Sequence, residues 1–480
     1  MKLEEFLAKN YNYNENVKNA MQTYITQWES WYKGKVAKFH NYFIYNGQRK
    51  VKQERYSMNM AKEISEDWAD IIWSEKCEIS MKDENSNTEF ENLIDTLNLY
   101  TIINQTLERA GALGTSATVT SIYDIKASED NLVLDVTEAK PRIDIVDVDN
   151  IYPLSWDNTG ITECAFASVK YIKGKKYVEC SVHKLNDKGN YVIHNHLFRE
   201  ENGNLTEVET GEDTLNEFDT KSNIKWFSIF KPLLTNNIVK NNPFGISYIA
   251  NAIDCLKAVD IAFDALKNEV VDGRKRTFVR SDLLSYEDGT QKMVFDVNDI
   301  SVYVLPKGAT KDDLIQHDAE SLRTASQIET LNTELNILGT KVGFGENHYH
   351  FDGQTLNTAT SVISSNSKMF RRKKKLEIGY ESSIYDLVYG LCYAVSTFGK
   401  YNINTNDMVV KFDDSIIEDK EAESQRAMAE ESRGIISKAE YRERIFGETI
   451  EIAKQKISEI FENEPSIEEI IGNTNTNIEE

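Results

Sequence analysis

Two pairs of histidines, each separated by one residue, are the first candidates for chemistry in this sequence. They are His194-Asn195-His196 and His348-Tyr349-His350. In a strand this spacing places both imidazoles on one face, where they could share a metal ion. Neither pair has a cysteine nearby or a clear third ligand, so the pattern describes surface or interface histidines better than a metal site. We therefore predict no metal and no cofactor.

The sequence motifs of common catalytic sites are missing. An ATPase of the P-loop class needs a GxxxxGK[ST] loop, because its backbone amides and lysine hold the phosphates. Gly339-Thr340-Lys341 lacks both the upstream glycine and the following Ser or Thr. HExxH, GxSxG and a Cys-His nucleophile context are absent as well. We therefore predict a protein that is not an enzyme. The enzymatic alternative is a metal-dependent nuclease that uses the histidine pairs and Asp413-Asp414.

Two clusters of basic residues stand out. The denser one is Arg371-Arg372-Lys373-Lys374-Lys375, and the other is Arg274-Lys275-Arg276. Five consecutive residues wrap a helix, so the first cluster predicts a positive collar that contacts DNA phosphates or acidic neighbouring subunits. A solvated or ion-paired collar is the alternative. The second cluster follows the end of a predicted helix, where the helix dipole favours cations, so capping explains it as well as a docking role does.

The composition limits the kinds of protein that this can be. The chain has 480 residues, a formal net charge of −23 and a pI near 4.9. This length predicts two or more substructures, and the acidity argues against sequence-specific DNA binding. An acidic wall can still surround DNA without gripping it, because like charges repel the phosphates. The longest apolar run, Leu387 to Val395, is too short to span a bilayer, and the first residues lack an apolar leader. The five cysteines are scattered, which is typical of reduced, buried thiols.

The first half of the chain predicts helices followed by strands. Apolar residues recur at helical spacing from Asn16 to Tyr45, a second helix follows Ser57 as a possible N-cap, and a third covers residues 87–112. We expect Trp28, Trp31 and Trp68 to pack in the core. From Ser116 to about Phe230 apolar residues recur at every second position, and glycines between these runs have the spacing of hairpin turns. This predicts an antiparallel β region.

The second half predicts two helices that bracket a small β insert. The first helix runs from Gly245 to Asp272, with one apolar stripe and an opposite polar side that includes Asp264. Short strands around Asp288-Gly289 form the insert. The second helix covers residues 319–342 and ends in a polar loop that reaches Gln354. A long helix, residues 358–398, comes next.

The order of these segments resembles the portal proteins of long-tailed, siphophage-type bacteriophages. The resemblance is carried by the following motifs, which extend over most of the chain: Trp31-Tyr32-Lys33-Gly34, the stretch from Asn59 to Ala69, Glu75 to Ile79, Ile151-Tyr152-Pro153-Leu154, Asn242 to Ser247, Thr358 to Ser367, and Phe412 to Ile416. No single motif is diagnostic, and the order of the motifs makes the case.

The resemblance implies an α+β portal subunit that assembles as a ring. The family plan implies this division: residues 1–242 as the wing, 243–272 as the first stem helix, 273–318 as the clip, 319–342 as the second stem helix, 343–357 as the tunnel loop, 358–417 as the long wing helix with its return strand, 418–462 as the helical crown, and 463–480 as an acidic tail without fixed structure. From Glu418 to Glu480 there are 8 basic and 17 acidic residues, so an acidic crown is expected. By position, Asn347, His348, Tyr349, His350 and Gln354 would line the channel and face DNA.

The resemblance also implies partners. The subunit would form a dodecameric ring at one capsid vertex and surround double-stranded DNA without sequence preference. The clip would meet the terminase large subunit and later the head–tail connector, or adaptor. The ring would also contact the major capsid and scaffolding proteins. The protein would be assembled in the host cytoplasm, without contact with a membrane. The structural alternative is another virion ring protein, from a tail or baseplate.

Overall fold

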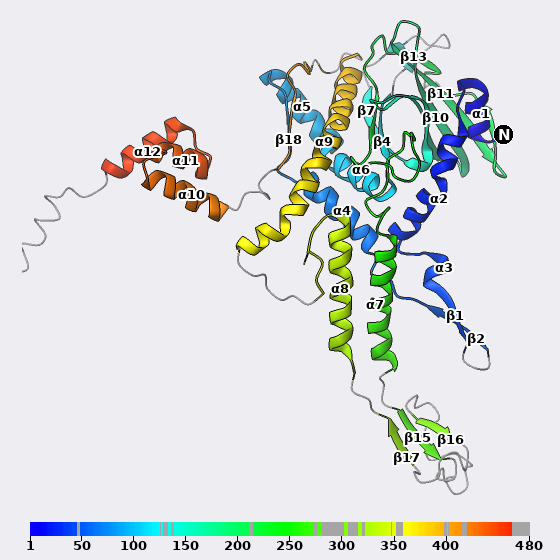
Figure 1. The fold of residues 1–480 in the computed structure, drawn as a ribbon. Helices are drawn as coiled ribbons and strands as arrows, with labels where there is room; N and C mark the ends of the chain where they lie inside the picture. The colour runs from blue at the N-terminus through cyan, green and yellow to red at the C-terminus, as the bar shows by residue number, and fades with distance from the viewer. Residues whose placement is uncertain are drawn as a thin grey trace, which may run out of the picture. The chain divides into compact units, whose positions relative to one another are not determined.

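The structure of the chain is a computed structural model. It describes residues 1–45, 49–124, 126–127, 133–135, 139–210, 215–272, 276–280, 302–305, 315–318, 322–346, 348–351, 359–397, 401, 403–413 and 420–462. Helices and strands are mixed along the chain, and the strands pair in separate sheets (Figure 1). The predicted α+β class is confirmed. The chain divides into two compact units: residues 1–356 with 364–412, and residues 357–363 with 413–480.

Helices open the first unit and bury the predicted tryptophans. These helices are α1 (Leu3–Tyr11), α2 (Glu15–Tyr32), α3 (Ala37–His40), α4 (Met60–Ile72), α5 (Glu84–Leu97) and α6 (Leu99–Leu113). Trp28, Trp31 and Trp68 are all buried in one large hydrophobic core, which confirms their packing role. The sequence pattern did not reveal α1.

The helix predicted from Asn16 to Tyr45 is wrong in its last part. After the turn at Gly34 and the short α3, the chain forms β1 (Asn41–Tyr45), which pairs antiparallel with β2 (Lys50–Glu54). The run Tyr42-Phe43-Ile44-Tyr45 consists of aromatic and β-branched residues, which favour strands. Its apolar residues therefore belong to a hairpin and not to a helix.

The helix predicted over residues 87–112 is two helices. Asn98 has φ 52°, in the left-handed region, and it ends α5 and precedes α6. Asparagine adopts this conformation more easily than most residues. The break lets α6 leave the direction of α5 and pack against α4 and α2.

The antiparallel β region is confirmed. A sheet with the order β12-β11-β10-β9-β8 has β13 beside β11, and a second sheet has the order β14-β4-β7; every neighbouring pair in both is antiparallel. The strands are β4 (Ser116–Tyr123), β7 (Lys140–Asp147), β8 (Ile151–Trp156), β9 (Ile161–Ile172), β10 (Lys175–Leu185), β11 (Tyr191–Glu201), β12 (Asn204–Val208), β13 (Glu217–Asp219) and β14 (Phe227–Phe230). A short 3-10 turn, Val148–Asn150, links β7 to β8, and two further short strands, β5 (Lys126–Ala127) and β6 (Val133–Asp135), pair with each other.

Two helices, α7 (Ile253–Asp272) and α8 (Thr324–Val342), lie side by side (Figure 1). Both begin later in the sequence than predicted. They run antiparallel: Arg323 at the start of α8 makes a bidentate ion pair with Glu269 near the end of α7, with N–O distances of 3.2 and 3.0 Å. Buried Leu256, Val259 and Leu266 line α7, and leucines line α8 at the predicted spacing.

Between α7 and α8 the chain forms a small sheet with the order β16-β15-β17. Its strands are β15 (Arg276–Arg280), β16 (Val302–Leu305) and β17 (Ile315–Asp318). β15 and β16 are parallel, so they are not the two arms of one hairpin, and β17 was not predicted. Asp288-Gly289 lies outside the described residues.

The remaining elements follow the predicted order. The long helix is α9 (Ala359–Thr397), and β18 (Val409–Lys411) pairs with β3 (Glu78–Ser80) in the first unit. In the second unit the predicted helical segment is divided into α10 (Lys420–Ser432), α11 (Lys438–Phe446) and α12 (Ile450–Glu462). Gly447, with φ 66°, ends α11.

Candidate functional site

The loop after α8 begins with a compact turn that is packed into the core. The amides of Gly343 and Phe344 both donate to the carbonyl of Gly339, at 3.0 and 2.9 Å. Gly343 has φ 105°, a conformation that favours glycine. Phe344 is fully buried between Trp68 and His348, with ring centroids 4.4 and 4.2 Å away. This aromatic stack fixes the start of the loop to α4.

A carboxylate of α4 holds the next two residues of the loop. The hydroxyl of Tyr349 donates to Asp67 Oδ2 at 2.7 Å, and His348 Nε2 lies 3.6 Å from the same oxygen. Burial, together with the negative charge of Asp67, raises the pKa of Tyr349, which keeps the phenol protonated as a donor. We call the arrangement of Gly343, Phe344, His348 and Tyr349 with Asp67 and Trp68 the loop root.

The predicted channel residues therefore fall into two groups. His348 and Tyr349 belong to the loop root, where Tyr349 is half-buried and the ring of His348 stacks on Phe344 while the residue remains exposed. His350 lies outside the root and is exposed as well. Phe351 is also exposed, and its amide donates to Asn332 of α8 at 2.8 Å. Asn347 and Gln354 lie outside the described residues.

The basic run of residues 371–375 lies on α9, but it is not a continuous exposed collar. Lys373 is completely buried, and its Nζ lies 2.5 Å from Glu377 Oε1, which is also buried. Lys374 reaches the other oxygen of Glu377 at 3.5 Å. Arg371, Lys374 and Lys375 are exposed. The helix therefore directs part of this charge inward, where a buried carboxylate compensates it.

Arg372, the second residue of the run, is partly buried beside a pair of tyrosines. Tyr248 and Tyr380 are both buried, and their hydroxyl oxygens are 2.9 Å apart. Burial lowers the pKa of Arg372, and it raises the pKa of both tyrosines. The side chain of Arg372 also packs against Gly343, where a Cβ atom would lie 3.1 Å from its Cγ. This residue links α9 to the loop root.

The second predicted basic cluster is mostly beyond the described residues. Arg274 and Lys275 lie outside them, and Arg276 is the first residue of β15, opposite Asp318 of β17. Its backbone is therefore part of the insert sheet and not the cap of α7.

The other histidine pair makes structural contacts. His194 and His196 lie on one face of β11, as predicted, since both rings contact the ring of Tyr11. Tyr11 and Glu207 contact the two ring nitrogens of His196, at 2.6 and 2.8 Å. Among the described residues, no three His, Cys, Asp or Glu side chains gather closely enough to hold a metal ion.

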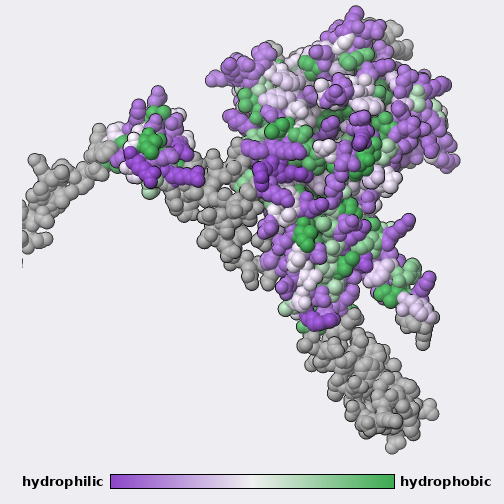
Figure 2. All heavy atoms as spheres, in the orientation of Figure 1, coloured by the Kyte–Doolittle hydropathy of each residue, from purple (hydrophilic) through white to green (hydrophobic). Residues whose placement is uncertain are grey.

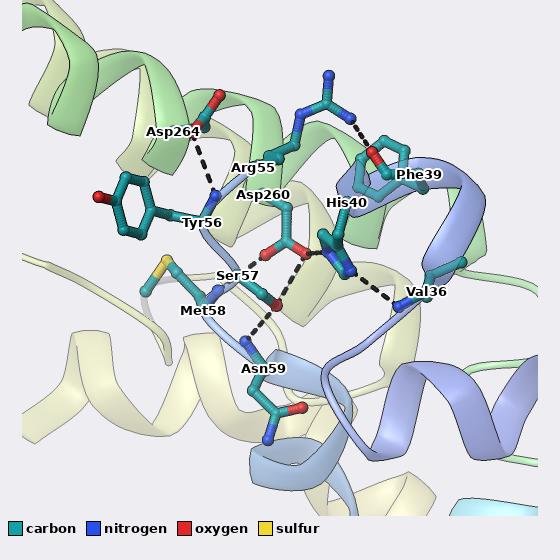
Figure 3. A network of polar contacts seen from close by, with 10 residues as sticks. All are labelled: Val36, Phe39, His40, Arg55, Tyr56, Ser57, Met58, Asn59, Asp260 and Asp264. Carbon is teal, nitrogen blue, oxygen red and sulfur yellow. Dashed lines mark hydrogen bonds and ion pairs between the residues drawn. The ribbon is translucent and has the colours of Figure 1, made fainter. Parts of the chain in front are cut away.

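A buried polar network that sequence reasoning missed joins the N-terminal segment to α7 (Figure 3). Asp260 accepts three hydrogen bonds, from His40 Nε2 at 2.9 Å, the Ser57 hydroxyl at 2.9 Å and the Met58 amide at 2.8 Å. Asp264, predicted on the polar side of the helix, is buried and accepts from the amide of Tyr56 at 3.1 Å. The sequence placed Asp264 on the polar side of the helix but did not reveal this burial, in which a backbone amide replaces water as the partner of the carboxylate.

The same network corrects the role of Ser57 and defines the state of His40. Ser57 does not cap α4, since its hydroxyl donates to Asp260, and Asn59 is the N-cap residue. The amide of Val36 donates to His40 Nδ1 at 2.8 Å, so that nitrogen carries no proton and Nε2 is the donor to Asp260. His40 is therefore a neutral imidazole that orients one carboxylate oxygen.

Two antiparallel helices bracket a small sheet in this chain, and an anchored loop and a long helix follow them. The family model described as phage portal protein, SPP1 Gp6-like, matches residues 12–467. The chain belongs to this portal protein family. No curated protein sequence matches the chain.

Membership in the portal family defines the general role. The protein is a siphophage-type portal protein and a component of the phage capsid that serves in genome packaging. The family is structural rather than enzymatic, and its members form oligomeric rings that meet capsid and terminase partners. None of the helices within the described ranges combines the length and the apolar character that a transmembrane segment requires.

Proposed function

We propose that this portal protein forms a dodecameric ring at one capsid vertex, through which double-stranded DNA enters and leaves. The observation that carries the proposal is the antiparallel pair α7 and α8 with a β insert at one end. A helix of 20 residues such as α7 is about 30 Å long, enough to form the wall of a channel. In the ring, α7 and α8 are the stem, and the insert is the clip that docks the terminase large subunit and the head–tail connector.

The other segments take the remaining roles in this proposal. Residues before Asn242 form the wing, α9 crosses it, and α10 to α12 form the crown. Exposed Arg371, Lys374 and Lys375 contact DNA or acidic neighbouring subunits. The capsid and scaffolding proteins contact the outside of the ring.

The loop after α8 has two functions in the proposal. Its root, with His348 and Tyr349, is held by Asp67 and resists displacement. His350, Asn347 and Gln354 line the channel and contact DNA without sequence preference. An anchored root is useful here, because a loop in contact with moving DNA experiences force along the channel.

Electron microscopy of the negatively stained, purified protein tests the ring. End-on averages with about a dozen subunits around a central hole are expected. Compact particles that stay unchanged at high protein concentration would contradict the proposal.

A loop variant tests the channel assignment. Replacing residues 352–357 with a Gly/Ser linker leaves the loop root intact, so rings should still form, while DNA packaging into heads should fail. A matched replacement at the exposed turn around Gly189, which has open space around it, is the control. Heads that fill normally with the loop variant would show that residues 352–357, with Gln354, are not needed for packaging.

A further inference from the structure

A short segment of this acidic chain is strongly basic and aromatic. Residues 35–55 contain six lysines and arginines and one glutamate, a net charge of +5, so the other residues of the chain carry −28. The segment consists of α3 and the β1–β2 hairpin, and we call it the basic arm. It extends beside α7, on the side away from α8 (Figure 1).

The base of the basic arm is held firmly. His40, directly before β1, and the backbone directly after β2 both bind the buried carboxylates of α7 (Figure 3). Arg55 adds a hydrogen bond from its Nη1 to the carbonyl of Phe39 at 2.9 Å. Two-stranded hairpins are marginally stable in water by themselves. The network therefore fixes where the arm leaves the body and which way it faces.

One face of the hairpin is exposed and carries both aromatic and basic side chains. Phe43 and Tyr45 are 67% and 66% exposed. Their cross-strand partners in the register are Lys52 and Lys50, which therefore lie on the same face and are exposed as well. Hydrophobic residues are visible at the hairpin surface in Figure 2. Aromatic side chains surrounded by cations are well suited to an acidic protein surface with an apolar centre.

We propose that the basic arm docks on α8 of the neighbouring copy of this chain. The inference rests on the proposed ring. In a cyclic ring each interface joins two different surfaces, so the arm on the α7 flank meets the opposite flank of the next copy, which is the α8 flank. Ile337 and Glu329 of α8 are exposed and available for this contact. Phe43 packs on Ile337, and Lys52 pairs with Glu329.

Duplex DNA is the other polyanion that a basic, aromatic segment would attract. One observation favours the neighbouring subunit. The exposed face carries two large aromatic side chains, Phe43 and Tyr45, and such apolar area gains more from an apolar protein surface than from phosphates.

Cysteine cross-linking of the full-length protein tests the contact. In the double variant Phe43→Cys with Ile337→Cys, mild oxidation should produce a ladder of covalent oligomers up to the ring size. Each single variant is the control for the native cysteines and should give no ladder. Rings that form in the double variant without any ladder would overturn the inference while leaving the proposed ring intact. A parent protein that forms no rings would count against both.

Charge reversal separates the neighbouring subunit from DNA. Lys50→Glu with Lys52→Glu should raise the concentration for half-maximal ring assembly about tenfold or more, and Glu329→Lys should restore part of it. Lys173→Glu with Lys175→Glu, the same change at an exposed turn, should leave assembly unchanged. If the arm variant assembles normally but its rings lose affinity for duplex DNA, the arm binds DNA and the inference is wrong.

Discussion

Replacing Lys373 by methionine tests whether the basic run of α9 is partly internal. Lys373 and Glu377 are 0% and 4% exposed, with 2.5 Å between Nζ and Oε1. Methionine keeps the length of the side chain and removes its charge, so Glu377 remains buried and loses its closest partner. Breaking a buried pair in this way costs about 3–5 kcal/mol, and Lys374 at 3.5 Å from the same carboxylate favours the lower end.

The loss can be measured as a shift of the calorimetric melting temperature. The first unit has roughly 400 residues, so its unfolding entropy near 60 °C is about 0.8 kcal/mol/K. A loss of 3–5 kcal/mol then corresponds to a decrease in Tm of about 4–6 °C. The control Lys374→Met should lower Tm by about 1 °C or less, since ion pairs of exposed lysines contribute little.

A second substitution tests the cause. Because the penalty comes from an unpaired buried carboxylate, Lys373→Met combined with Glu377→Leu should recover most of the lost stability. If Lys373→Met alone leaves Tm unchanged, Lys373 is not buried with Glu377, and the whole basic run is available to DNA or to a neighbouring subunit.

Three further predictions concern the loop root and the buried tyrosines. Tyr349→Phe removes the hydrogen bond to Asp67 and should cost about 1–3 kcal/mol, with faster proteolysis of the loop but unchanged far-ultraviolet circular dichroism. Gly343→Ala should destabilise the protein by about 1–3 kcal/mol because the backbone there has φ 105°, and by more because the added Cβ would contact α9. The control Gly189→Ala has open space around it, so only its positive φ should cost stability. The melting temperatures of the two variants test this difference. Burial raises the pKa of Tyr11 to about 12, and it also raises the pKa of other tyrosines. Their protonated phenols therefore contribute their full stability below pH 10, and this contribution is lost as the pH rises through the pKa values of the folded state. Phenolate absorbance should therefore rise in two steps, with the second coinciding with unfolding.

The sequence predicted the secondary structure correctly where one spacing of apolar residues continued over many residues. The helix pattern of α8 and α9 and the alternation of the antiparallel sheets depend on local spacing, so they could be read without a structure. The segment from Phe39 to Tyr45 is short and ends in four consecutive aromatic or apolar residues, so it shows neither the spacing of a helix nor the alternation of a strand. The prediction of a helix there failed for this reason.

The polar contacts of the site could not be predicted, because they join residues far apart in the chain. Tyr349 and Asp67 are 282 positions apart, and His40 and Asp260 are 220 apart. The spacing of apolar residues put Asp264 on the polar side of its helix, but spacing alone could not show that this carboxylate is buried. Only the fold brings the amide of Tyr56 to this carboxylate and makes its burial favourable.

Both sets of contacts involve α4 or the segment directly before it, so they connect α7 and α8 through α4. The segment that precedes α4 binds α7 through Asp260, and α4 itself holds the loop root after α8 through Asp67 and Trp68. A tilt of α7 relative to α4 would leave the buried carboxylate of Asp260 without its donors, and a tilt of α8 would separate the partly buried Asp67 from Tyr349. Each lost hydrogen bond of this kind costs about 1–3 kcal/mol. Both helices and α4 are therefore coupled into one body.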